Sequence, residues 1–112
     1  MVNWNGERFL DHCLSAVLAQ TVAPHEIIQV DNASSDTSID IVRRYPSVRL
    51  LAQDQNLGFA HGNNVAINAA AGDFQWIALL NPGAFPDPGW LEALLAAATE
   101  VASVGWTIAA NS

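Results

Sequence analysis

Hydrophobic positions along the chain fall into short runs that alternate with longer stretches of helical spacing. The runs predict β-strands because they are short, rich in branched residues and bounded by polar turns. They cover residues 26–31, 48–52 and 76–80, with a weaker run at 102–108. Only residues 1–3 precede the first polar turn, so the first strand is predicted to be very short.

The first helical stretch carries a hydrophobic stripe. Its members recur at intervals of three and four, as one face of an α-helix requires, and are Leu10, Cys13, Leu14, Val17 and Leu18. The residues between them that fall outside the stripe are polar: Glu7, Arg8, Asp11 and Ser15. The spacing therefore predicts a helix whose stripe, including the single cysteine, faces the core.

A second and a third helix are predicted from signals at their ends. Ser35 or Asp36 can cap the second helix, and Pro46 prevents its continuation. The third helix is predicted over 58–71, with Gly72 in the left-handed position that often follows a helix.

A fourth helix is predicted over 87–98. Asp87 can act as its N-cap, and Pro88 suits the first helical position because the fixed φ of proline is already helical. Strands and helices therefore alternate along the chain. This alternation predicts the α/β class, with a doubly wound, mostly parallel sheet that carries helices on both faces.

The short first strand has a consequence for the predicted sheet. In a doubly wound sheet the first strand usually lies near the middle. A strand of so few residues in that place indicates that it is truncated and that the natural domain begins several residues earlier. It also leaves neighbouring strands with unpaired backbone groups, so we expect weak stability or self-association through these unpaired strands.

Composition narrows the class of protein. The chain has 112 residues, 51% of them hydrophobic and 13% charged, which fits one domain over 1–112. Its net charge is −7 and its four basic residues are all arginine, which argues against nucleic-acid binding. No signal peptide is recognisable, no hydrophobic run approaches the ~20 residues of a membrane span, and one cysteine excludes an internal disulfide. We therefore expect a cytoplasmic protein without a transmembrane segment.

Polar residues follow each predicted strand at its carboxyl end. The segments are 3–5, 31–36, 54–60 and 81–85, and all are rich in Asn, Asp, Ser or Gly. The carboxyl ends of parallel strands share one edge of the sheet, where open α/β proteins bind their ligands. The sequence therefore predicts a polar rim with a binding cleft along it.

Four segments in register resemble glycosyltransferase family 2. They are Val2-Asn3-Trp4-Asn5-Gly6, Ile28-Gln29-Val30-Asp31-Asn32-Ala33-Ser34-Ser35-Asp36, Asn56-Leu57-Gly58-Phe59-Ala60-His61-Gly62-Asn63-Asn64, and Leu79-Leu80-Asn81-Pro82 with Ala84. The resemblance covers roughly residues 2 to 98, and Asn-Leu-Gly-Phe-Ala is most similar to the bacterial branch that includes rhamnosyltransferases. It implies a GT-A fold, the Rossmann-like half of an enzyme that binds a nucleotide-diphosphate sugar.

The resemblance also implies roles for the polar rim. Asn3, Trp4 and Asn5 lie against the nucleotide in this reading, and the Asp31 carboxylate accepts a hydrogen bond from a ring N–H of uracil or thymine. Asp36 lies near the ribose, although a helix cap explains this residue equally well. Asp31 with Ser34 can likewise be a simple turn, because such residues are common in these loops.

The wall beside the sugar diphosphate is implied by the third segment. It consists of Gly58, Phe59, Ala60 and Asn63, where glycine permits close approach of the backbone and a helix N-terminus favours anions. With few cations of its own, the chain needs such a helix end or a divalent metal to hold a diphosphate.

The metal motif departs from the family pattern. Where the family has Asn-Pro-Asp, whose last carboxylate ligates Mg²⁺ or Mn²⁺, this chain has Asn81-Pro82-Gly83. Glycine supplies no side-chain oxygen to a hard cation. Asn81 remains as a weak, neutral ligand, so the cofactor expected for the family lacks its carboxylate here.

The expected function follows from these assignments. The chain is expected to bind a UDP- or dTDP-sugar for transfer to a hydroxyl of an acceptor glycan or lipid-linked glycan. No residue is assigned as the catalytic base, which the family takes from a following region, so the chain is interpreted as a partial domain that is inactive alone. One alternative is a non-catalytic nucleotide-binding or interaction module. Another, a dinucleotide-dependent oxidoreductase, lacks the Gly-x-Gly-x-x-Gly turn.

Overall fold

Three parallel strands form the sheet of the computed structural model, which describes residues 1–70, 72 and 74–103. They are β1 (Val2–Asn3), β2 (Ile27–Asp31) and β3 (Val48–Ala52), in the spatial order β1-β2-β3. The predictions of a parallel sheet and of a very short first strand are confirmed.

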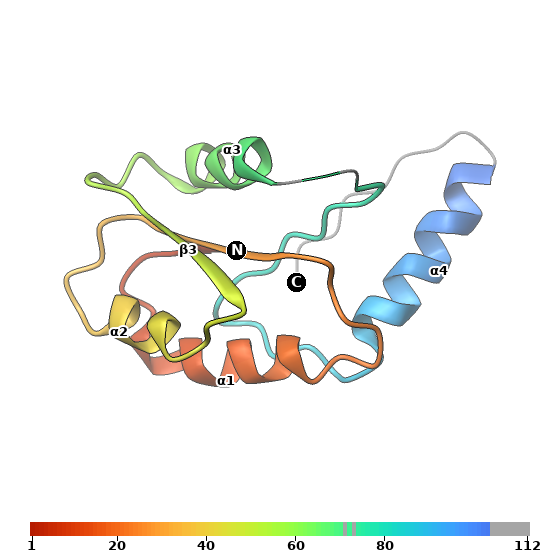
Figure 1. The fold of residues 1–112 in the computed structure, drawn as a ribbon, viewed down its shortest axis with the longest axis horizontal. Coiled ribbons are helices and arrows are strands. Elements are labelled where there is room, and N and C mark those ends of the chain that lie inside the picture. Colours follow the sequence, from red (N-terminus) through yellow and green to blue (C-terminus); the bar gives the residue numbers. More distant parts are fainter. Residues whose placement is uncertain (71, 73, 104–112) are drawn as a thin grey trace.

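The described residues form four helices: α1 (Glu7–Leu18), α2 (Ser38–Arg43), α3 (Phe59–Ala69) and α4 (Trp90–Ser103). In Figure 1, α1 and α2 lie together on one side of the strands and α3 lies on the other side, against β1 and β2. Helices therefore cover both faces, as the α/β prediction requires. None of the helices in the part of the chain that the structure describes could span a membrane.

Strand β2 is paired unequally along its two edges. Strand β3 pairs with it over its full length, from Ile27 to Asp31. Strand β1 pairs with only its last two residues, Val30 and Asp31. The amino-terminal half of β2 is therefore held on one edge alone, as far as the described strands show.

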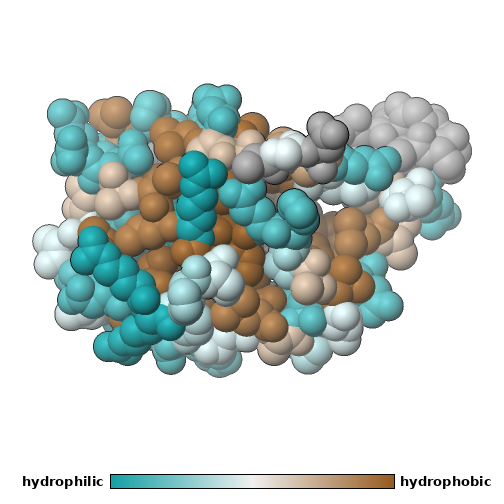
Figure 2. All heavy atoms as spheres, in the orientation of Figure 1, coloured by the Kyte–Doolittle hydropathy of each residue, from teal (hydrophilic) through white to brown (hydrophobic). Residues whose placement is uncertain are grey.

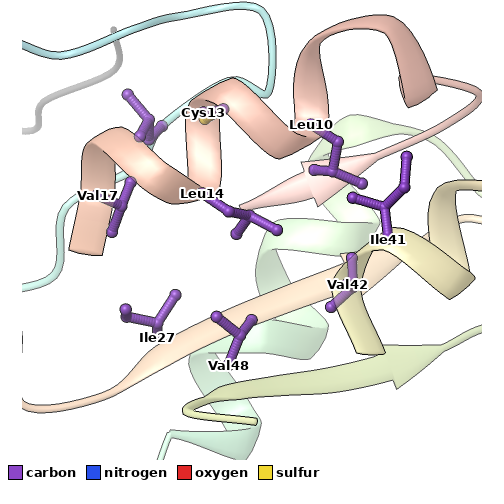
Figure 3. Packing of buried hydrophobic residues seen from close by; sticks show 9 residues of the cluster. Leu10, Cys13, Leu14, Val17, Ile27, Ile41, Val42 and Val48 are labelled. Carbon is purple, nitrogen blue, oxygen red and sulfur yellow. The ribbon is translucent and has the colours of Figure 1, made fainter. Parts of the chain in front are cut away.

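The core lies between α1, α2 and the face of the sheet that they cover, as Figure 3 shows. Four of the five stripe residues predicted in α1 are buried, and Cys13 is among them. Burial raises the pKa of the Cys13 thiol to about 11, although the nearby Met1 ammonium opposes this, so the thiol is an inert core group. Leu18 is 44% exposed, and its place in the stripe was predicted wrongly because α1 ends there.

The predicted strand over 76–80 is wrong. Only Leu79 forms an isolated bridge, while Leu80 is buried and joins the core. A strand needs a continued ladder with a neighbour, and hydrophobicity alone does not supply one. The weaker strand over 102–108 is also not found where it can be checked, because Ala102 and Ser103 end α4. The rest of that run lies outside the described residues.

The predicted bounds of the later helices need correction. Helix α3 ends at Ala69 with Ala70 as its C-cap, so Gly72, despite its φ of 77°, lies too far along to be the residue that stops it. Helix α4 begins at Trp90, later than predicted. Asp87 does not cap it with its side chain; instead, the Asp87 backbone carbonyl accepts a hydrogen bond from Trp90 N at 3.0 Å.

The cap of α4 comes from a distant side chain. Gln20, just beyond α1, accepts a hydrogen bond from Leu91 N at 2.9 Å and donates to the Asp87 carbonyl at 2.8 Å. Its side chain thus satisfies backbone groups at the start of α4 that have no partner inside the helix. Gln20 fixes the start of α4 to the end of α1.

Candidate functional site

The carboxyl ends of β1 and β2 are joined by a small hydrogen-bond network. Register places Asn3 opposite Asp31, and the Asn3 amide nitrogen donates to Asp31 Oδ1 at 3.0 Å. Ser34 donates to the same carboxylate twice, from its hydroxyl to Oδ1 at 2.7 Å and from its backbone N to Oδ2 at 2.9 Å. The first two predicted site segments therefore meet, as the polar rim requires.

The Asp31 carboxylate is fully buried inside this network. Its two oxygens accept all three of these hydrogen bonds, so in this structure they organise the loop after β2. The turn interpretation of Asp31 and Ser34 is thus confirmed as a structural role. A contact between Asp31 and a base stays a prediction, and it requires the carboxylate to exchange one of these partners for the ring N–H.

Asn5 links the first loop to the second. Its backbone N donates to Ser34 Oγ at 2.9 Å, and its side-chain oxygen accepts from Ser35 N at 2.8 Å. Asn5 has a φ of 50°, a left-handed conformation that asparagine tolerates better than most residues. Beside it, Trp4 is 59% exposed on the rim. A side chain at position 4 can therefore meet a ligand without any rearrangement.

Asp36 and Glu7 cap each other's helices. Asp36 accepts hydrogen bonds from Glu7 N at 3.1 Å and from Ser38 N at 2.9 Å, so it caps both α1 and α2. Glu7 in turn accepts from the N and hydroxyl of Thr37, at 2.9 and 2.6 Å. Desolvation acts to raise the pKa of Asp36, but the hydrogen bonds from Ser38 and Glu7 outweigh it and lower this pKa. Asp36 thus accepts hydrogen bonds from the first amides of both helices, as the capping interpretation expects, although the N-cap position of α2 is occupied by Thr37. Contact with a ribose stays a prediction.

Asn32 connects the end of β2 to the start of α3. Its side-chain nitrogen donates to the Gly58 carbonyl at 3.1 Å, and its side-chain oxygen is buried without a partner in the described structure. Sequence reasoning assigned no role to Asn32. The available signal was its place directly after Asp31, at the carboxyl end of β2, where ligands of parallel sheets bind.

Helix α3 presents its amino end at the same edge of the sheet. Its N-cap is Gly58, which has a φ of 95° and makes no side-chain cap hydrogen bond to the first turn of α3. Phe59 is 46% exposed and Ala60 is exposed beside it. Asn63 lies one turn further on and is buried. Of the predicted wall residues, Asn63 is therefore the least suited to reach a ligand.

The Asn81 segment also reaches the end of β1. Gly6 lies between Asn3 and Pro82. A Cβ atom added to Gly6 would be 2.2 Å from Asn3 Oδ1 and 3.8 Å from Cβ of Pro82, so this place suits a glycine. The Asn81 carbonyl accepts from Ala84 N at 2.9 Å and from the Cys13 thiol at 3.7 Å. The loop after the fourth predicted strand is thus fixed beside the first loop, with Asn81 itself exposed.

Comparison with known proteins identifies the family that builds this rim. The model of the family described as glycosyl transferase family 2 matches residues 1–111. The chain belongs to glycosyl transferase family 2. The resemblance inferred from the four segments is therefore confirmed over almost the whole length of the chain.

Two bacterial relatives show how much of the chain is shared. The chain is 35% identical over 100 residues to the N-acetylglucosaminyl-diphospho-decaprenol L-rhamnosyltransferase of Mycobacterium tuberculosis, covering 80% of this chain and 33% of that protein. It is 34% identical over 80 residues to the succinoglycan biosynthesis protein ExoO of Rhizobium meliloti, covering 70% of this chain and 22% of that protein. The chain thus spans about a third or less of the length of these relatives.

Solved structures share the fold of this family 2 chain. Residues 1–349 of TarS from S. aureus match with a TM-score of 0.77 at 22% sequence identity, covering 90% of this chain and 31% of that chain. The same protein in complex with UDP matches with a TM-score of 0.76 at 22% identity and the same coverage. These similarities confirm the GT-A arrangement of strands and helices.

The metal motif of the family is incomplete in this member. Gly83 is exposed and supplies no ligand, and the described residues contain no group of three or more His, Cys, Asp or Glu side chains that could hold a metal ion. Asn81 offers a single neutral oxygen. The residues of this segment therefore do not fit a divalent cation by themselves, because Mg²⁺ and Mn²⁺ prefer carboxylate ligands.

A cavity of about 560 Å³ lies away from the rim of the family 2 domain. It is bordered by the amino-terminal half of β2, the carboxyl-terminal half of α3, residues 74–80 and α4, and its lining is mostly hydrophobic. Of the predicted site residues, only Asn63 borders it. This cavity is not the predicted site, because a nucleotide diphosphate needs polar and amide donors that gather at the opposite ends of the strands.

Proposed function

We propose that this chain forms the donor-binding part of a glycosyltransferase that uses a UDP- or dTDP-sugar. The observation that carries the proposal is the convergence of four segments on one edge of the sheet in a family 2 chain. Asn3 contacts Asp31, Asn32 contacts Gly58, and Pro82 lies beside Gly6. Residues far apart in sequence thus form a continuous polar rim at the carboxyl ends of parallel strands.

Two parts of this rim suit the two parts of a nucleotide diphosphate. The β1 and β2 loops carry Asn3, Asn5, Asp31 and Asp36 beside the exposed Trp4 ring, which suits a base and ribose. The amino end of α3 suits a diphosphate, because amides without partners and the helix dipole attract anions. TarS, which has the same fold, has been solved in complex with UDP, and this supports a nucleotide ligand for the fold.

The proposed sugar transfer also needs an acceptor, and we propose a hydroxyl of a glycan or lipid-linked glycan. The related rhamnosyltransferase, whose name includes a diphospho-decaprenol acceptor, supports this class. The described residues offer no carboxylate on the rim that we can assign as catalytic base. We therefore propose that residues 1–112 act as a partial domain that is inactive without a further region. We also propose that the protein is located in the cytoplasm.

Titration calorimetry tests the donor site directly. UDP and dTDP are titrated into the folded protein, with and without Mn²⁺, and we expect saturable binding of at least one of them. Failure of both nucleotides to bind a protein shown to be folded by circular dichroism would remove the proposed function.

A negative charge added at the start of α3 tests whether the diphosphate binds there. Ala60→Glu puts a carboxylate in the first turn of α3. Its negative charge interacts favourably with the helix dipole but repels a bound diphosphate. We expect unchanged or higher thermal stability with about tenfold weaker UDP binding, since a repulsion of ~1 kcal/mol or more is expected between close charges in water. Asn68→Glu, exposed near the other end of α3, is the matched control and should leave UDP affinity unchanged.

The second candidate function is a non-catalytic nucleotide-binding module, favoured by the missing carboxylate at Gly83. Gly83→Asp discriminates the two, because a Cβ at this position meets no atom within 4 Å and the new acid needs no repacking. A strong rise in Mn²⁺-dependent UDP affinity supports a transferase scaffold that lacks only this ligand. Gly89→Asp, equally open, is the control for added charge. No change in either variant favours the module.

A further inference from the structure

Asn32 lies beneath the first turn of α3. Its backbone N continues the ladder of β2 by donating to the Asn3 carbonyl at 2.8 Å. Side chains alternate between the faces of a sheet, so Asn32 lies on the face opposite Asp31, which is the face that α3 covers (Figure 1). Asn32 is 2% exposed, and its Nδ2 would be 3.3 Å from a Cβ added to Gly62. The absence of a side chain at Gly62 thus makes room for Asn32 against the helix.

The Asn32 side chain holds the carbonyl of Gly58, the N-cap of α3. Asn32 Nδ2 donates to this carbonyl at 3.1 Å, and Gly62 N donates to it at 3.1 Å as the helix begins. On its other side, Gly58 N donates to Asn56 Oδ1 at 3.0 Å. Both polar backbone groups of Gly58 are therefore held by asparagine side chains from two different loops.

Hydrophobic packing does not fix Gly58. Its φ of 95° and ψ of 171° lie in a region that is essentially reserved for glycine, and apart from its chain neighbours no atom lies within 4 Å of a Cβ added there. Its neighbours Leu57 and Phe59 are 57% and 46% exposed. Most residues at the left of Figure 2, where β3 leads to α3, are hydrophilic, whereas hydrophobic residues reach the surface over the middle of the molecule and toward α4. Hydrogen bonds must therefore set the direction of the Gly58 carbonyl.

This direction matters for the amides that follow Gly58. The hydrogen bond from Gly62 N is the first of the helix, so the amides of residues 59–61 come before it and point out of the helix end. Such amides bind an anion well only when they converge on one place. Asn32 Oδ1, in contrast, is buried without a partner in the described structure. A buried acceptor without a partner costs stability, so stability alone does not explain this side chain.

We propose that Asn32 is a positioning residue for the diphosphate of the donor. It holds the Gly58 carbonyl so that the amides of residues 59–61 converge on one phosphate-bearing anion, and it acts through Gly58 without touching the ligand. The identity of this anion as a sugar donor rests on the proposed function. Two consecutive residues then serve the two ends of the donor, because Asp31 organises the loop beside the base and Asn32 organises the start of α3.

Asn32→Leu tests the positioning role, because leucine has a similar size but no donor. The Gly58 carbonyl keeps its bond from Gly62 N and the unpartnered oxygen is removed, so the midpoint of thermal unfolding should stay or rise. UDP affinity should nevertheless fall about fivefold. A merely structural role predicts the reverse, a lower midpoint with unchanged affinity of the folded protein. Asn68→Leu, exposed near the other end of α3, is the matched control and should leave UDP affinity unchanged. Asn32→Ala, which also lacks the donor, should show the same loss of affinity and replaces the leucine variant if that variant does not fold.

Inorganic pyrophosphate separates this proposal from the proposed function. Titrated into the parent protein, it should shift the amide NMR resonances of residues 59–61, and about fivefold more should be needed in Asn32→Leu. No response of these amides in the parent, or an equal response in the two proteins, would overturn the positioning role. Equal UDP affinity of the two proteins would overturn it too and leave the proposed function intact. If UDP and dTDP fail to bind while pyrophosphate shifts these amides in the expected order, the nucleotide donor is removed and the positioning role stands.

Discussion

The close approach of α3 to β1 makes a sharp prediction for Gly62. A Cβ at this position would lie 2.7 Å from one methyl group of Val2, a distance that real Cβ atoms essentially never show, and 3.0 Å from the other, which is tighter than most real contacts. The next neighbour, Asn32 Nδ2 at 3.3 Å, is tight but can shift slightly. Both Val2 methyl groups must therefore move, and with them the two-residue strand that ends at Asn3.

Two opposing terms set the size of the effect of Gly62→Ala. Alanine is a better helix former than glycine by about 1 kcal/mol, and Gly62 lies inside α3. Overpacking a tight site costs roughly 1–3 kcal/mol. We expect a net loss of up to about 2 kcal/mol in the free energy of unfolding, since the overlap outweighs the gain in helix propensity.

A double-mutant cycle with Val2→Ala separates these two terms. Removing the Val2 methyl groups removes the overlap, so only the helix propensity remains. In the Val2→Ala background, Gly62→Ala should therefore stabilise the protein by up to about 1 kcal/mol, which reverses the sign seen in the parent. Urea denaturation followed by circular dichroism measures all four proteins. The same sign and size of effect in both backgrounds would refute the packing argument.

Three further predictions concern hydrogen bonds at the rim and between helices. Asp31→Asn should destabilise the protein by roughly 2–4 kcal/mol in urea denaturation, because an amide nitrogen would face a buried donor in place of a carboxylate oxygen that accepts. Asp36→Ala should cost about 1 kcal/mol through the loss of the helix cap. Gln20→Ala should speed hydrogen exchange at Leu91 N, its partner in α4.

The Asp36 prediction includes a dependence on pH. The folded-state pKa of Asp36 lies below its ordinary value of 3.8, so its contribution is present above that value and is lost as the pH falls through the folded-state pKa. The difference in stability between parent and Asp36→Ala should therefore shrink below about pH 4. A difference that stays constant in acid would contradict the charged cap.

The Asp31 prediction is checked by combining Asp31→Asn with Ser34→Ala. Effects of the two substitutions that simply add would contradict the hydrogen-bond network.

Local patterns predicted those parts of the fold that local forces determine. The buried positions of α1 follow from helical spacing, and β2 and β3 follow from short hydrophobic runs bounded by turns. The run over 76–80 has the same composition yet forms no ladder, because pairing depends on a neighbour elsewhere in the chain. The start of α4 was misplaced for a similar reason, since its cap is Gln20, distant in sequence.

The candidate site was predicted in outline but not in detail. That Asn3, Asp31 and Gly58 belong to one rim follows from strand ends and the family motifs, and the structure brings these segments together. Sequence could not show that Asp31 would be enclosed by Asn3 and Ser34, or that the neighbouring Asn32 would have a buried oxygen without a partner in the described structure. Both depend on side-chain contacts across segments that only the folded chain defines.

The open surroundings of Gly83 have an evolutionary consequence. Apart from its chain neighbours, no atom lies within 4 Å of a Cβ added there, and codons for glycine and aspartate can differ by one nucleotide. A lineage can therefore lose or regain the acidic residue of its metal motif in a single mutational step, without compensating changes in the surrounding packing. Close homologues with either residue at this position are expected to share one backbone.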